Sequence, residues 1–363
     1  MKVLFLANKL STVCGVSKHL YYLLEELKNN YSNNEYYLLC GGGDSVEKFE
    51  KLGIIVLVTP NIKHENRTII KYMKAIYEIY NFAKINSIEV IHSHHHYAAS
   101  IAMKASKLSN IKTVLTNHGI LPEIGFLNHF DADYIIAINE HIQEYLLKNK
   151  VVEQEKIIFI RLGFPERHLE EKRISKIKII AGGRFVKDKG FDVYIKAVAG
   201  INKSLRKKVR FFIAGNGEEE KELRIINEKE NANVRFLGKV NDFQKTLCRM
   251  DVFIMTSRSK SEGFPTVLIE AGIANNLVIS TNFRGLLDVL SKKEIEIVNV
   301  DDIISLSRKL EEVILNYESF RNKILNFNLF VKENFNQKYM TKNTIDLYAK
   351  MIKSDKREDG IER

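Results

Sequence analysis

The 363-residue sequence contains only three cysteines, Cys14, Cys40 and Cys248, which lie far apart and form no C-x-x-C pair. This spacing argues against a disulfide framework and a cysteine zinc site, and it fits the reducing cytoplasm. No apolar run approaches the roughly 20 residues of a membrane-spanning helix. The opening MKVLFLANKL has a very short apolar run and predicts a first β-strand, not a signal peptide. We therefore expect a cytoplasmic protein, with peripheral contact at the inner face of the membrane left open.

Nucleic-acid recognition motifs and interleaved aromatic and basic residues are also lacking. The net charge of +11 lies almost wholly in the second half of the chain. A basic nucleic-acid-binding protein is therefore one alternative. We favour solvated helix faces, with a modest preference for anionic small molecules, and expect no nucleic-acid partner.

Short β-branched segments alternate with amphipathic stretches, and this rhythm occurs twice. It predicts two α/β domains, each with a parallel, doubly wound sheet. The first series of expected strands is 2–7, 35–40, 54–59, 89–93, 112–117 and 133–138. The second series is a strand near 177 followed by 209–215, 234–238, 251–257 and 277–281. We place the domain bounds at 1–165, a linker at 166–176, 177–330, a helix at 331–352 and a flexible tail at 353–363.

The segment SEGFPTVLIEAG (261–272) predicts an anion site at the start of a helix. Pro265 suits a first helical position, and Gly263 permits a tight turn before it. The unpaired N–H groups of a first helical turn favour a phosphate. Glu262 and Glu270 flank this corner, where carboxylates are better suited to the hydroxyls of a sugar than to the phosphate.

The segment AGGRFVKDKGFDVYIKA (181–197) follows the first strand of the second series. Its Arg184 presents a planar fork to phosphate oxygens, and Lys189 presents a compact charge. The alternative is a solvated basic loop.

Taken in order, GGRFVKDKGFD, FFIAGNGEEEKEL, VRFLGKV and SRSKSEGFPTVLIEAG resemble the donor-binding half of the family 4 glycosyltransferases, retaining enzymes with the GT-B fold. The family's two glutamates, eight positions apart, stand here as Glu262 and Glu270. The resemblance is strong over 177–290 and looser over 1–165. It implies two Rossmann-like domains facing across a cleft, the first on the acceptor side and the second binding a nucleotide sugar. The C-terminal helix would pack back on the first domain.

By this resemblance, Arg184 and Lys189 hold the nucleotide diphosphate, Glu270 takes the ribose hydroxyls and Glu262 lies against the donor sugar. The backbone that would line the sugar and phosphates belongs to Gly263, Phe264, Pro265 and Thr266. The residues that would border the base are Gly215, Gly217 and Gly238.

The loop NKLSTVCGVSKHL (8–20) matches the family's glycine loop, but Cys14-Gly15 stands where the family usually has two glycines. Gly15 remains a donor-binding candidate. Because no G-x-G-x-x-G opens the first helix, a nicotinamide enzyme is disfavoured. GGGDS (41–45) lacks that spacing and predicts a strand-to-helix turn.

Histidines follow two of the expected strands. The resemblance places His118, in LTNHGILPE, near the reacting sugar, where it hydrogen-bonds a hydroxyl or positions the acceptor; a satisfied core histidine is the alternative. IHSHHHYAAS (91–100) suggests a metal, yet adjacent residues rarely turn toward one ion. We interpret it as a polar loop on the acceptor side, with no role assigned to His92, His94, His95 or His96. Asp131-x-Asp133 precedes a strand and is predicted to be structural.

Residues 61–84 mix basic and large apolar residues at helical spacing. Such a helix either lies on an anionic membrane, which would suit a lipid-linked acceptor, or buries one face in the protein. We favour burial in the protein.

The sequence therefore predicts a retaining hexosyl- or N-acetylhexosaminyltransferase that uses a nucleotide diphosphate-sugar, a UDP-sugar first of all. Its acceptor would be a glycan, a lipid-linked glycan or a small molecule. Catalysis would rest on His118, Glu262, Arg184 and Lys189, and no metal or other cofactor is expected. An epimerase or hydrolase on the same fold is the alternative enzyme.

Overall fold

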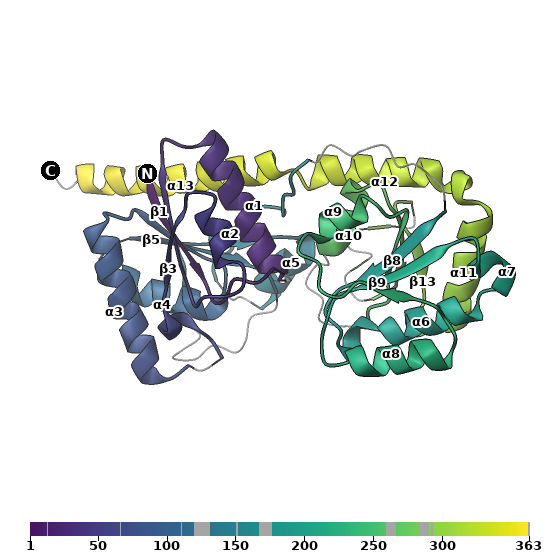
Figure 1. Ribbon diagram of the computed structural model, residues 1–363. Helices are drawn as coiled ribbons and strands as arrows, with labels where there is room; N and C mark the ends of the chain where they lie inside the picture. Colours follow the sequence, from purple (N-terminus) through teal and green to yellow (C-terminus); the bar gives the residue numbers. More distant parts are fainter. Residues whose placement is uncertain are drawn as a thin grey trace. The chain divides into compact units, whose positions relative to one another are not determined.

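The chain folds into two compact units, formed by residues Met1–Pro165 with Phe335–Arg363 and by Glu166–Asn334. Figure 1 shows the computed structural model. The structure describes residues 1–12, 14–65, 67–109, 111–119, 131–149, 152–166, 176–258, 266–283, 286, 290–291 and 293–361, with side chains as far as residue 353.

In its described part, the first unit is built on a seven-stranded parallel sheet in the order β3-β2-β1-β4-β5-β6-β7. Its strands are β1 (Lys2–Ala7), β2 (Glu35–Cys40), β3 (Ile55–Val58), β4 (Val90–Ser93), β5 (Lys112–Asn117), β6 (Tyr134–Ala137) and β7 (Ile157–Phe159). Its helices are α1 (Gly15–Asn30), α2 (Val46–Glu50), η1 (Pro60–Ile62), α3 (Ile69–Ile85), α4 (His96–Ser106), α5 (Glu140–Lys148), η2 (Gln154–Lys156) and α13 (Gln337–Ile361).

Both faces of the first sheet are buried, because successive side chains of a strand point to opposite faces. Val3 and Phe5 pack on the side of α1, α2 and α13, whereas Leu4 and Leu6 pack on the side of α3 and α4. The C-terminal helix α13 therefore completes the first core, as predicted (Figure 1).

The described part of the second unit has a six-stranded parallel sheet in the order β10-β9-β8-β11-β12-β13. Its strands are β8 (Lys178–Gly182), β9 (Arg210–Ala214), β10 (Arg235–Phe236), β11 (Val252–Met255), β12 (Leu277–Thr281) and β13 (Glu296–Val298). Its helices are η3 (Lys187–Lys189), α6 (Phe191–Gly200), α7 (Lys203–Arg206), α8 (Glu220–Lys229), α9 (Phe243–Leu247), α10 (Thr266–Ile273), α11 (Ile303–Leu315), η4 (Tyr317–Phe320) and α12 (Arg321–Asn334).

The predicted α/β fold and its strands are confirmed, and four strands, β1, β2, β5 and β12, have their expected bounds. The edge strands β7 and β13 were not expected, because three residues are too few to show a pattern. At the C-terminus, α13 runs to Ile361, past residue 353, where a flexible tail was expected. Among the described residues, no helix combines the length and the apolar character needed to cross a membrane.

Each strand order reverses direction once, between β1 and β4 in the first sheet and between β8 and β11 in the second. At such a reversal the loops beyond two adjacent strands diverge, and this is where open α/β sheets bind ligands. Functional side chains are therefore expected just beyond these strands.

A substitution at Gly272 tests how closely α10 packs against α12. A Cβ at this position would lie 2.7 Å from Val331 Cγ2 and 2.8 Å from Phe327 Cε1 of α12. Alanine favours a helix over glycine by about 1 kcal/mol, but overpacking costs about 1–3 kcal/mol. Gly272→Ala is therefore expected to lower the Tm in thermal unfolding. Gly200→Ala is the control, because a Cβ there would meet only the Ser307 side chain, at 3.0 and 3.6 Å, and it should leave the Tm unchanged or raise it. A raised Tm for Gly272→Ala would contradict the close approach.

Candidate donor site and a buried histidine group

Three glycines make close backbone contacts at the carboxyl edge of the second sheet. The Gly215 N–H donates to the Gly238 carbonyl at 2.8 Å, and the Gly183 N–H donates to the Ala214 carbonyl at 3.0 Å. Gly215 has φ +140°, and a Cβ there would lie 1.8 Å from the Gly183 carbonyl oxygen. Only glycine permits this backbone contact. The loops after β8, β9 and β10 thus meet at the glycines that the family resemblance places beside the base, and Gly217 belongs to the same turn.

The two predicted diphosphate residues stand on the loop after β8. Arg184 is exposed, and its guanidinium makes no hydrogen bond or ion pair with a described residue. Lys189 ends η3, half-buried, just before Gly190 turns the chain into α6 with φ +63°. A Cβ at Gly190 would lie 2.1 Å from the Thr256 carbonyl oxygen, so this turn packs directly on the loop after β11.

Arg258, which sequence reasoning did not single out, holds these two loops together. Its guanidinium donates to both carboxylate oxygens of Asp192 at 2.8 and 2.9 Å and to the Lys187 carbonyl at 2.9 Å. Its Nε lies 2.5 Å from Asp301. Burial raises the pKa of Asp192, but the hydrogen bonds and charge of Arg258 outweigh it and hold that pKa below its usual value. Arg258 is therefore a positioning residue for the turn that carries Lys189.

Helix α10 begins at Thr266 and carries Glu270 in its second turn. Glu270 is only 1% exposed, so its carboxylate is not a surface acid. A buried carboxylate is costly unless it has polar partners, and Glu270 has an interaction with the rest of the chain. The predicted Glu262, Gly263, Phe264 and Pro265 lie outside the described residues.

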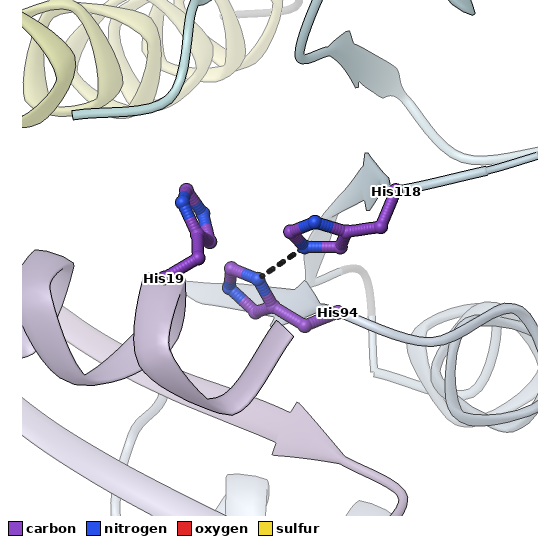
Figure 2. Close-up of side chains that lie close together, drawn as sticks. All are labelled: His19, His94 and His118. Carbon is purple, nitrogen blue, oxygen red and sulfur yellow. Dashed lines mark hydrogen bonds between the residues drawn. The ribbon is translucent and has the colours of Figure 1, made fainter. Parts of the chain in front are cut away.

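In the first unit, three histidines from separate elements converge beyond the sheet's carboxyl edge (Figure 2). His19 lies one turn into α1, His94 directly follows β4, and His118 directly follows β5. His94 Nδ1 is 3.4 Å from His118 Nε2, and the His19 ring centroid is 4.9 Å from that of His118. His19 was missed because one histidine in a helix gives no signal of its spatial partners.

Burial determines the charge of this histidine group. His19 and His94 are buried and His118 is half-buried. Burial lowers the pKa of His118 to about 3 and holds those of His19 and His94 well below the usual value. The group is therefore neutral near pH 7, with acceptor nitrogens available.

The consecutive histidines divide between different surroundings. His92 is satisfied within the core, with Nδ1 2.5 Å from the Tyr348 hydroxyl of α13 and Nε2 2.7 Å from Thr116 Oγ1. The rings of His95 and His96 lie beside His64, with centroids 5.4 and 5.0 Å away. Of the three consecutive histidines, only His94 is separate, because the rings of His95 and His96 lie together, with centroids 4.1 Å apart.

The remaining predicted positions are accounted for. Gly15 is the first residue of α1, and GGGDS forms the turn between β2 and α2. Asp133 accepts hydrogen bonds from the Thr113 N–H and hydroxyl at 2.7 and 2.8 Å, and Asp131 pairs with Lys156 at 3.5 Å. These aspartates lie at the amino edge of the sheet and are structural, as predicted.

Two α/β units with parallel sheets, and a basic loop at the carboxyl edge of the second sheet, are the features expected of a glycosyltransferase of the GT-B class. The comparison with protein families gives the same class. The model described as Glycosyltransferase Family 4 matches residues 13–166, and the model described as Glycosyl transferases group 1 matches residues 166–326. The chain therefore belongs to the family 4 glycosyltransferases.

Similar proteins include an uncharacterised glycosyltransferase of Methanocaldococcus jannaschii, 27% identical over 63% of this chain and 61% of that protein. A Campylobacter jejuni enzyme is 25% identical over 75% of this chain and 87% of its own length; its name describes α-1,4-N-acetyl-D-galactosaminyl transfer to an undecaprenol diphosphate-linked glycan. Anabaena HepE, solved with UDP and glucose, has a TM-score of 0.79 at 16% identity, covering 96% of this chain and 100% of that one. This last likeness shows the fold alone.

Asp192 provides a test of the Arg258 contacts. Because its pKa is lower in the folded state, its stabilisation is complete at neutral pH and is lost as the pH falls through the folded pKa. Asp192→Asn is expected to lower the free energy of unfolding by about 1.5–3 kcal/mol at neutral pH, and by less below about pH 4, in urea titrations.

The matched control is Asp301→Asn, which removes the more exposed partner of Arg258 and should cost no more than about 1 kcal/mol. Equal losses in the free energy of unfolding for the two variants at neutral pH would contradict the assignment of Asp192 as the main partner of Arg258.

Proposed function

We propose that this family 4 glycosyltransferase moves a hexosyl or N-acetylhexosaminyl group from a UDP-sugar to a hydroxyl of a glycan, with retention of anomeric configuration. The observation that carries the proposal is the carboxyl edge of the second sheet. There the exposed Arg184 and the half-buried Lys189 share one loop, glycines allow the neighbouring turns to approach closely, and α10 buries Glu270.

The chemistry follows from these charges. As the bond between the sugar C1 and the β-phosphate oxygen breaks, negative charge develops on the leaving diphosphate. Arg184 and Lys189 stabilise that charge, which takes the place of a metal at the phosphates. The acceptor oxygen bonds to C1 from the same face, and its proton goes to the departing phosphate oxygen. The Glu270 carboxylate accepts hydrogen bonds from the ribose hydroxyls, Glu262 contacts the donor sugar, and His118 forms a hydrogen bond with a sugar hydroxyl.

UDP is the first donor to test because HepE was solved with UDP. The proposed acceptor is a lipid-linked glycan, as in the name of the Campylobacter relative. An epimerase or hydrolase on this fold would release free sugar, so product analysis with and without acceptor separates these activities.

A feature of α3 supports a lipid-linked acceptor. Ile69, Ile70, Met73 and Tyr77 are between 53% and 69% exposed, although the same helix buries Tyr72, Ala75, Ile76, Ile79 and Ala83. The exposed Lys74 lies within this row. An apolar row with adjoining cations is typical of helices that lie on anionic membranes. We therefore propose peripheral membrane contact through α3.

The donor site is tested by thermal unfolding with UDP, GDP, ADP and CMP, each with and without chelator. A ligand at about 100 times its Kd stabilises the folded state by about 2.7 kcal/mol. One nucleotide should raise the Tm irrespective of chelator. Arg184→Ala removes a charge-assisted contact of about 1.5–3 kcal/mol and should raise the Kd roughly 10- to 100-fold.

The matched control is Arg210→Ala, an exposed arginine in the same unit at the amino end of β9, which should bind the nucleotide normally. If no nucleotide raises the Tm, or if both arginine variants lose binding equally, the assigned donor site is wrong.

Membrane contact is tested by co-sedimentation with phosphatidylglycerol vesicles and with phosphatidylcholine vesicles. Ile70→Ser/Met73→Ser removes apolar area worth roughly 25 cal/mol per Å² and should weaken binding to the anionic vesicles at least about 10-fold. Ile225→Ser/Ile304→Ser removes two equally exposed side chains of the second unit and should not. Unchanged binding in the α3 variant would exclude α3 as the contact.

A further inference from the structure

The histidine group of the first unit contains more unsatisfied polar atoms than core packing explains. Both ring nitrogens of His19 and the Nε2 of His94 are buried without a partner among the described residues. Burying an unpaired polar group costs roughly 1–3 kcal/mol, and a ligand that binds a nitrogen of His19 would offset part of this cost. The neighbouring His92 shows the contrast, because both of its nitrogens are hydrogen-bonded.

The spacing of the nitrogens fits one small cation. One nitrogen from each of His19, His94 and His118 lies within 4.8 Å of the other two. Two nitrogens bound tetrahedrally to zinc at about 2.0–2.1 Å are about 3.3–3.4 Å apart. The His94 Nδ1 to His118 Nε2 distance is 3.4 Å, so these two already have the separation of neighbouring ligands. His19 needs only a small side-chain movement to join them.

We propose that His19, His94 and His118 form a binding site for a divalent cation of the zinc type. Imidazole nitrogens favour zinc and similar transition metals, and the group contains none of the carboxylates that magnesium or calcium requires. Three protein ligands leave a fourth position for water or another oxygen ligand. The half-buried His118 gives the site its open side.

The bound cation would fasten three elements to one another. His19 comes from α1, His94 from the turn after β4, and His118 from the turn after β5 (Figure 2). The His94 N–H already donates to the Leu6 carbonyl of β1 at 2.9 Å, so that ligand has a fixed backbone. The site goes beyond the proposed function, although the two share His118: the cation would bind its Nε2, which faces His94, and the Nδ1 of the same ring would serve the sugar hydroxyl.

The test is zinc binding by the full-length chain after removal of metals with a chelator. Equilibrium dialysis with elemental analysis should give one zinc per chain, and zinc should raise the Tm by mass action. Cobalt in the same site should show the visible absorption of a tetrahedral nitrogen complex. His94→Gln and His118→Gln should each raise the Kd for zinc at least about 10-fold, since loss of even an outer-shell partner costs that much. Circular dichroism checks that both variants fold, and the half-buried His118 is the safer position.

The matched control is His64→Gln, which removes a histidine of the other group, formed by His64, His95 and His96. This variant should bind zinc like the unaltered chain. Absence of stoichiometric binding, binding unaffected by both His94→Gln and His118→Gln, or loss of binding in His64→Gln would each overturn the proposal. Zinc is measured without nucleotide, and nucleotide binding is measured with chelator, so failure of one assignment is distinguishable from failure of the other.

Discussion

Parallel strand pairing is the constraint on which both candidate sites depend. Parallel neighbours require crossover helices, and these helices bury both faces of each sheet, so polar side chains gather at its edges. All carboxyl ends of one sheet open on one edge. His94 and His118 therefore meet although 24 residues separate them, and Arg184 and Arg258 stand on adjoining loops for the same reason.

Backbone contact shapes the second unit's edge more than side chains do. The turns after β8, β9 and β10 approach so closely that a Cβ at Gly215 or Gly190 would collide with a carbonyl oxygen. Because backbone contacts form this edge, charge is supplied there by a few side chains, Arg184 and Lys189 among them. Arg258 fixes the position of the loop that carries one of these side chains, Lys189.

In the first unit the cost of burial determines the chemistry. Six of its histidines have strongly lowered pKa values because burial disfavours the imidazolium form. They can therefore accept hydrogen bonds or bind a metal, but they are poor cations near neutral pH. The C-terminal helix α13 contributes to this arrangement. Its Tyr348 hydroxyl is hydrogen-bonded to His92, two residues before His94 in the chain.

The amino-acid sequence by itself determined the fold class and the places of most strands along the chain, because alternation of apolar residues and turn glycines are local patterns. The donor-site residues, which come from the order of motifs, remain a proposal. It did not reveal β7 or β13, whose three residues are too few for a pattern. Only the tertiary structure placed His19 beside His94 and His118, joined Arg258 to Asp192 and buried Glu270. Convergence of side chains depends on how strands pair and helices cross, and one linear sequence does not encode such distances in any local signal.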